Sequence, residues 1–247
     1  DYQDNLIVAA EPFFLWAIEG GDDLKAKLPF HKTDLNVKIV DDIRPFKMIK
    51  VRILNGAHTA MVPCSLLYGN KLVMETVNGD FTGPFVDNVI SEISETLAMD
   101  KNEITAYCEE VMDRFKNPFI KHALADIALN SISKFKVRVL PSLLGYYNAK
   151  AKLPTNLTFS LACLIQFYKG TWNNEALPVK DTPELVEAFK NAWQLGTLDL
   201  VVAKVLTNTE FWGEDLTKIN GLSEALVVAL SEIEANGIEK GFANFSK

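Results

Sequence analysis

Cysteine is scarce in this sequence, and the three cysteines form no recognisable motif. Cys64, Cys108 and Cys163 are widely spaced and include no CxxC pair. This spacing disfavours a disulfide framework and a zinc site, and a reducing, cytoplasmic compartment fits best. The simplest role for each cysteine is that of a small buried apolar side chain.

Histidine is equally scarce. His31, His58 and His122 have no HExxH spacing or other ligand spacing. The acidic pairs at 41–42 and 109–110 are adjacent in sequence, so on a helix their carboxylates diverge by ~100° and do not converge on one ion. We therefore expect no metal site, which disfavours a metal-dependent hydrolase.

The sequence also lacks long apolar runs and a surplus of positive charge. No apolar stretch reaches the ~18–20 residues that cross a bilayer, and no secretory signal pattern is present. The 25 lysines and arginines are outnumbered by 32 aspartates and glutamates, which gives a net charge of −7. Nucleic-acid binding needs the opposite balance. We expect neither a membrane nor a nucleic-acid partner.

What the sequence does contain is helical periodicity, over 247 residues of which 48% are hydrophobic. Helices are expected at residues 86–97, 103–115, 157–168, 182–196, 198–206 and 221–237. Strands are expected only at 5–9 and 36–40, with a turn at 20–23 and a long loop at 169–181. Phe13, Phe14 and Trp16 are expected to be core aromatics. The pattern predicts a mainly α fold with a few N-terminal strands.

The segment 46–62 is expected to be a helix that carries three polar side chains on one half of its surface. At ~100° per residue, Lys50, His58 and Asn55 fall at roughly 0°, 80° and 140°. Apolar neighbours indicate that much of the helix is buried, so these groups need partners. One interpretation is structural, with a snorkelling lysine, a capping asparagine and a core histidine. The other is a substrate pocket with a buried lysine base and two hydrogen-bond donors.

The residues Lys50, Asn55 and His58, within KVRILNGAHTA, resemble the active-site helix of the long-chain mannitol dehydrogenase family. The resemblance continues in Arg114-Phe-Lys-Asn-Pro118, which is similar to an R-F-x-N-P element, and in Lys134-Phe-Lys-Val-Arg-Val-Leu-Pro141, which is similar to a K-x5-L-P element. Residues 14–20 look like the stretch that closes the family's cofactor domain. Most of the chain, from about residue 11 onward, is covered.

The resemblance implies a metal-independent dehydrogenase that uses NAD. Its fold would be a multi-helix C-terminal domain like that of 6-phosphogluconate dehydrogenase, at residues 46–247, with residues 1–45 as the end of the cofactor domain. Lys50 would be the general acid/base, Asn55 would polarise the reacting oxygen and His58 would orient substrate hydroxyls. Lys134 would bind the far end of the substrate. The family's arginine eight residues earlier is replaced here by Asp126.

Two departures resemble the uronate branch, whose members interconvert tagaturonate and altronate. Polyol members carry Asp-Thr after N-P and Asp-Gly before the K…LP segment, where this chain has residues 121–122 and 130–131. A hexuronate has a carboxylate that mannitol lacks, and cationic donors recognise it. Lys121, His122, Lys134 and Arg138 are the expected substrate-binding cluster, together with the nearby Lys136. Because the charges at 134, 136 and 138 alternate, a solvated strand edge is the alternative.

No GxGxxG turn occurs among the 13 glycines, and the first residue is Asp1. We therefore expect the chain to be the substrate half of a two-domain enzyme, to depend on its own N-terminal Rossmann domain for NAD, and to have little activity alone. The alternatives are a fructuronate reductase, a mannitol-type polyol dehydrogenase, and a non-catalytic helical interaction module.

Overall fold

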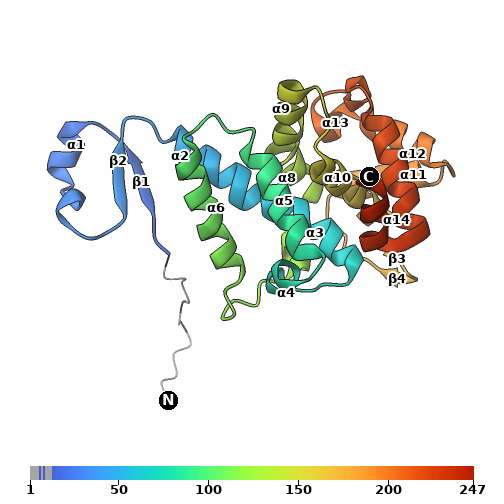
Figure 1. Ribbon diagram of the computed structural model, residues 1–247, viewed down its shortest axis with the longest axis horizontal. Helices are drawn as coiled ribbons and strands as arrows, with labels where there is room; N and C mark the ends of the chain where they lie inside the picture. The colour runs from blue at the N-terminus through green and yellow to red at the C-terminus, as the bar shows by residue number, and fades with distance from the viewer. Residues whose placement is uncertain (1–5, 7, 9–12) are drawn as a thin grey trace, which may run out of the picture. The chain divides into compact units, whose positions relative to one another are not determined.

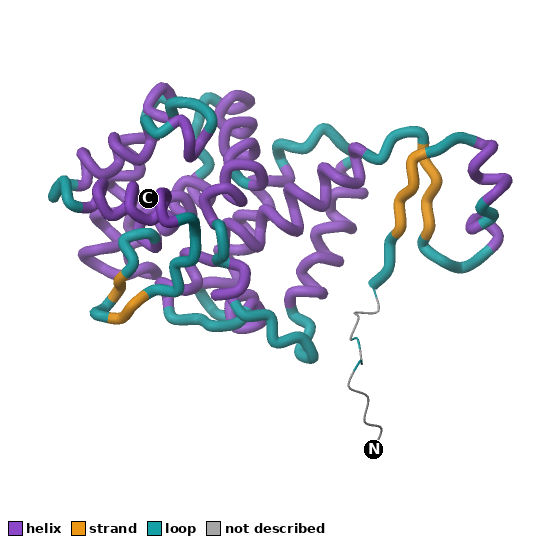
Figure 2. Tube along the Cα trace, turned by 180° about the vertical axis from the view of Figure 1, so that it is seen from behind, coloured by secondary structure: helices purple, strands orange, loops and turns teal. Residues whose placement is uncertain are grey.

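The computed structural model describes residues 6, 8 and 13–247, in two compact units, Asp1–Met48 and Ile49–Lys247. In the first unit, β1 (Trp16–Glu19) pairs in parallel with β2 (Val37–Val40), in a register from Trp16↔Val37 to Glu19↔Val40. The helix α1 (Asp22–Lys27) and the 3-10 helix η1 (Phe30–Lys32) connect the two strands, which are orange in Figure 2. This is a short β–α–β unit.

In the first unit one sequence-based expectation is confirmed, one falls largely outside the described residues and two are wrong. The strand expected at 36–40 is confirmed, but the one expected at 5–9 lies outside the described residues except for Leu6 and Val8. The turn expected at 20–23 is wrong in its second half, because Asp22 begins α1. Phe14 and Trp16 are 48% and 50% exposed, so the prediction that they are core residues is wrong. Two strands and one short helix bury little surface, which leaves such side chains open.

The second unit is built from helices and one small hairpin (Figure 1). Its elements, beginning with α2 at the boundary between the units, are α2 (Arg44–Ile49), the π-helix η2 (Lys50–Leu54), α3 (Asn55–Tyr68), α4 (Val73–Asn78), α5 (Thr82–Ser94), α6 (Lys101–Phe115), α7 (Leu124–Ile127), α8 (Ser131–Arg138), α9 (Leu140–Lys150), α10 (Thr155–Phe167), β3 (Thr171–Trp172), β4 (Glu175–Ala176), α11 (Pro183–Trp193), α12 (Leu198–Leu206), α13 (Thr209–Trp212), the 3-10 helix η3 (Leu216–Lys218) and α14 (Leu222–Phe245). The mainly α fold with a few strands is confirmed.

The core of this unit is arranged around α10, which packs against α3, α5 and α14. Every residue of α10 from Leu157 to Phe167 is buried, as its all-round apolar sequence predicts. The Ser160 hydroxyl donates to the Ala60 carbonyl at 2.7 Å and fixes the contact with α3. The Glu92 carboxylate accepts hydrogen bonds from the Asn156 and Leu157 backbone at 2.9 and 2.8 Å, and so caps the first turn of α10.

Several expected helix ends are confirmed. The Thr182 hydroxyl caps α11, and Pro183 occupies its first position. The helix from residue 221 breaks at Gly237, whose φ of 77° and ψ of −176° suit glycine, and then resumes to Phe245. Glu232 holds this break, because its carboxylate accepts from the side-chain amides of Asn236 and Asn244, both at 2.8 Å.

Two further segments differ from expectation. The loop expected at 169–181 contains an antiparallel hairpin, β3–β4, in which Trp172 pairs with Glu175. The strand-edge alternative for residues 134–138 is wrong, because these residues form the second half of α8. On a helix, Lys134 and Arg138 share a face, while Lys136 lies on another side.

Candidate functional site

Lys50 and Asn55 lie at the two ends of a π-helical turn. The Asn55 N–H donates to the Lys50 carbonyl, an i→i+5 bond that closes η2. In an unbroken α-helix these residues would point ~140° apart. The wider π turn takes more residues to close, so it brings Asn55 nearer to the direction of Lys50. The expected continuous α-helix is therefore wrong at this point, and π-bulges occur frequently at functional sites.

The exposure of the three motif residues increases toward the start of the helix. Lys50 is exposed in this chain, as in the interpretation with a snorkelling lysine, while the neighbouring Ile53 and Leu54 fill the buried side of the turn. Asn55 is half-buried, and its side-chain amide makes no hydrogen bond within the described residues. His58 is largely enclosed. The lysine amine and the asparagine amide are thus both available to a ligand.

His58 contacts two rings, those of Phe115 and His122, whose residues lie far from it along the chain. Its ring stacks on Phe115 at 4.1 Å between centroids, and His122 meets it edge-on at 5.0 Å. His58 Nε2 is buried and has no hydrogen-bond partner among the residues that the structure describes. Burial, followed by His122, Arg114 and Arg138, lowers the pKa of His58 to about 3. His58 is therefore a neutral imidazole at physiological pH.

The expected cationic cluster is only partly assembled. Lys134 and Arg138 are half-buried on one face of α8, and burial is the main cause that lowers the pKa of each. The Lys134 ammonium donates to the Ile127 carbonyl at 2.9 Å. Neither cation forms an ion pair within the part of the chain that the structure describes. Lys121 and His122 are exposed, and His122 reaches the site through its ring contact with His58.

The helices η2 and α3 meet the α8–α9 segment at a close crossing. A Cβ built on Gly56 would lie 3.2 Å from the Arg138 carbonyl oxygen, so glycine permits this approach. On one side of the crossing Arg52 donates to the Ser142 hydroxyl at 3.1 Å, and on the other Arg138 donates to the Thr59 hydroxyl at 3.3 Å. These two pairs show that the segments run in opposite directions. The crossing brings Arg138 close to the His58 turn.

Three residues of this site are not predicted by the sequence. Phe115 belongs to a motif but has no role assigned by it, and Arg52 and Thr59 belong to no predicted site. A threonine four residues after Asn55 is a recognisable signal, since its hydroxyl can bond to that carbonyl. The structure shows this bond at 2.8 Å.

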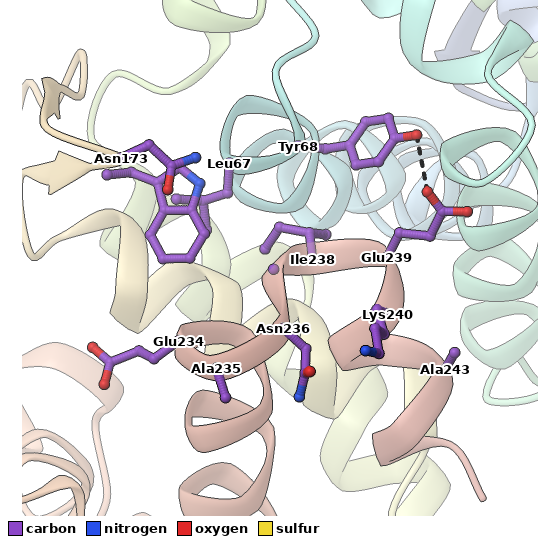
Figure 3. A pocket seen from close by; sticks show the side chains of 12 residues that line it. Leu67, Tyr68, Asn173, Glu234, Ala235, Asn236, Ile238, Glu239, Lys240 and Ala243 are labelled. Atoms are coloured by element: carbon purple, nitrogen blue, oxygen red, sulfur yellow. Dashed lines mark hydrogen bonds between the residues drawn. The ribbon is translucent and has the colours of Figure 1, made fainter.

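The surface clefts lie elsewhere. A cleft of 730 Å³ covers the break at Gly237, where the Tyr68 hydroxyl donates to Glu239 at 3.2 Å (Figure 3). A cleft of 610 Å³ adjoins the β3–β4 hairpin, and one of 470 Å³ lies between α5 and α6. None of the three is lined by Lys50, Asn55 or His58. Of the three motif residues, Lys50 is exposed and Asn55 half-buried, while His58 Nε2 is buried.

Within residues 6, 8 and 13–247, no group of three or more histidine, cysteine, aspartate or glutamate side chains could hold a metal ion. No helix in that part of the chain is long and apolar enough to cross a membrane.

Comparison with known proteins identifies relatives over nearly the whole chain. Residues 42–234 match the model of the mannitol dehydrogenase C-terminal domain. The chain is 42% identical to the altronate oxidoreductase of Bacillus subtilis over 247 residues, which is 99% of this chain and 50% of that protein. It is 40% identical to the Yersinia enterocolitica altronate oxidoreductase, over 99% of this chain and 52% of that protein. The chain thus spans about half the length of the curated relatives it matches.

Solved structures support the same fold. The chain matches Pseudomonas fluorescens mannitol 2-dehydrogenase, solved as a ternary complex with NAD and D-mannitol, with a TM-score of 0.76 and 21% identity over 85% of this chain and 42% of that one. It matches a substrate-free D-sorbitol dehydrogenase with a TM-score of 0.69 and 16% identity, over 83% and 42% of the two chains.

Proposed function

Because the chain belongs to the mannitol dehydrogenase C-terminal domain family, we propose that it is the substrate-binding half of an NAD-dependent oxidoreductase that interconverts tagaturonate and altronate. The observation that supports an acidic substrate is the burial of Lys134 and Arg138 and their lack of ion pairs among the described residues. Both are half-buried cations in a chain with a net charge of −7. Cations that form no ion pair suit a substrate anion, and Arg138 also lies near the neutral His58 imidazole.

The sequence contains no GxGxxG turn for a dinucleotide, and the three clefts described above are not lined by a glycine-rich helix start. NAD would be held by an N-terminal Rossmann domain of the longer protein, where it supplies the hydride acceptor. The short β1–β2 unit, within residues 1–45, would be the end of that domain. The residues of this chain would handle the proton and the substrate.

The proton would move at Lys50. In alcohol oxidation its amine accepts the hydroxyl proton, and in ketone reduction its ammonium returns it. The Asn55 amide, which makes no hydrogen bond among the described residues, would donate to the oxygen on which charge develops. Neutral His58 would orient the substrate hydroxyls. Arg138 and Lys134 would bind the carboxylate, with Lys121 and His122 at the rim. Docking of the cofactor domain would exclude water from the exposed Lys50.

The proposal is tested with Lys50→Ala in the full-length protein. Lys50 is exposed, so the fold should persist while kcat falls ~10²–10⁴-fold, the range for a lost general acid/base. Lys47→Ala, three residues earlier and also exposed, is the control and should keep its kcat. Near-normal turnover in Lys50→Ala would remove Lys50 from this role.

Comparison of kcat/KM for tagaturonate, fructuronate and fructose separates the uronate activity from the two nearest alternatives, a fructuronate reductase and a mannitol-type polyol dehydrogenase. Activity on none of them would favour a non-catalytic helical module. We also place the protein in the cytoplasm, because Cys64, Cys108 and Cys163 are free thiols.

A further inference from the structure

Thr59 connects two residues of the proposed site through one hydroxyl group. Its Oγ1 donates to the Asn55 carbonyl at 2.8 Å and accepts from Arg138 Nη1 at 3.3 Å. Thr59 is only 4% exposed, so water cannot replace either bond easily. A hydroxyl has one proton and two lone pairs, so donating to Asn55 orients its oxygen to accept from the arginine.

Few other groups fix the Arg138 side chain. The Thr59 hydroxyl is its one hydrogen-bond acceptor among residues 6, 8 and 13–247, and no carboxylate there neutralises it. A long side chain with a single hydroxyl partner loses much rotamer entropy when a substrate orders it. Holding the guanidinium beforehand removes part of that cost. The Asn55 residue that accepts from Thr59 is itself held in place, because the Asn55 N–H donates to the Lys50 carbonyl and closes the π turn.

We propose that Thr59 is a positioning residue, which holds the Arg138 guanidinium ready for the substrate carboxylate and so favours acidic over neutral sugar substrates. This inference rests on the proposed function. Thr59 does not touch the reacting atoms. Its effect passes through Arg138, and it therefore acts on substrate affinity rather than on the chemical step.

The experiment compares Thr59→Val with Thr59→Ser in the full-length protein. Valine keeps the shape and removes the hydroxyl, and serine restores the hydroxyl. We expect Thr59→Val to raise KM for altronate ~10-fold, equivalent to about 1.4 kcal/mol, with kcat within about twofold of the parent. Thr59→Ser should return KM to near the parent value. Thr158→Val is the matched control, since Thr158 is buried in α10 and its hydroxyl has no partner among the described residues.

A double-mutant cycle with Arg138→Met shows whether the effect passes through the arginine. Thr59→Val should have no further effect on KM in the Arg138→Met background. The proposal is overturned if Thr59→Val raises KM equally in both backgrounds, if it lowers kcat at constant KM, or if Thr158→Val raises KM as much. If Thr59→Val does not fold, as circular dichroism would show, Thr59→Ala takes its place in the cycle.

The two proposals fail in different ways. Full turnover by Lys50→Ala, or no activity on any sugar acid in the parent enzyme, removes the proposed function. Loss of turnover in Lys50→Ala together with an unchanged altronate KM in Thr59→Val removes only the role of Thr59.

Discussion

His58 stacks on Phe115 with their ring centroids 4.1 Å apart and their planes 26° apart. The contact encloses one face of the imidazole, and the second histidine at its edge and the nearby arginines add positive potential. The protein therefore holds this histidine in its neutral form, which can accept or donate one hydrogen bond without a change of charge. This property governs the first prediction.

The stability of the protein should fall with acid in a manner that depends on His58. Its pKa is lowered from 6.5 to about 3 on folding, so the unfolded chain binds a proton between those values and the folded chain does not. The contribution of neutral His58 to the free energy of unfolding is fully present above pH 6.5. It decreases as the pH falls toward 3, by up to ~1.4 kcal/mol per pH unit. Urea unfolding from pH 7.5 to 4.5 should give a shallower decline for His58→Gln than for the parent.

The control for that experiment is His31→Gln, because His31 is exposed. The parent and His31→Gln should decline together as the pH falls. Equal slopes in all three proteins would contradict the assignment of the acid sensitivity to His58.

Gly56→Ala should destabilise the helix crossing. The new Cβ would lie 3.2 Å from the Arg138 carbonyl oxygen and 3.4 Å from the Ile93 side chain, and a backbone oxygen cannot move freely. Overpacking costs ~1–3 kcal/mol, which exceeds the ~0.5–1 kcal/mol that alanine gains over glycine in a helix. Gly145→Ala is the matched control, since its nearest neighbour lies at 3.5 Å. Thermal unfolding should show a lower Tm for Gly56→Ala alone.

Glu92→Ala should be strongly destabilising. Its carboxylate accepts from the Asn156 backbone and side chain and from the Leu157 backbone, all within 2.9 Å, at the buried start of α10. Removing it leaves backbone donors unsatisfied, at ~2–4 kcal/mol in total. Glu95→Ala breaks an exposed pair with Lys150, which solvent screens, and should cost much less. Similar free energies of unfolding for the two variants would contradict this role.

Lys134→Met should weaken binding of an acidic substrate. A hydrogen bond to a charged group contributes ~1.5–3 kcal/mol, so KM for altronate should rise ~10–150-fold. Lys152→Met, an exposed residue beyond α9, should leave KM unchanged. An altronate KM in Lys134→Met equal to the parent value would show that the carboxylate binds elsewhere.

Much of the helical architecture follows from local rules. Thr182 and Pro183 begin α11 because a capping hydroxyl and a fixed φ suit that position in any context. Phe14 and Trp16 depend instead on how much surface their neighbours cover, which the local sequence does not specify. The same holds for Lys50, whose apolar neighbours in sequence allowed either a snorkelling or a buried lysine and which is exposed in this chain.

The sequence predicts which residue types form the site, but it does not predict how those residues contact one another. Lys50, Asn55 and His58 were identified by their motif, but the stacking partner Phe115 comes from another helix, and no periodic pattern links the two. The charges of α8 alternate like those of a strand. Lys134 and Arg138 share a face because the structure makes this segment the helix α8, in which residues four apart are neighbours.

The π turn at Lys50–Leu54 acts on the helix as a one-letter insertion acts on a reading frame. Compared with an unbroken α-helix, every side chain after the π turn is rotated about the helix axis relative to those before it. The amino-acid composition of the segment does not predict this rotation. The number of residues between Lys50 and Asn55 is therefore a specification in its own right. A redesign that improved each local helix propensity and shortened this segment by one residue would keep the letters of the motif and lose their alignment.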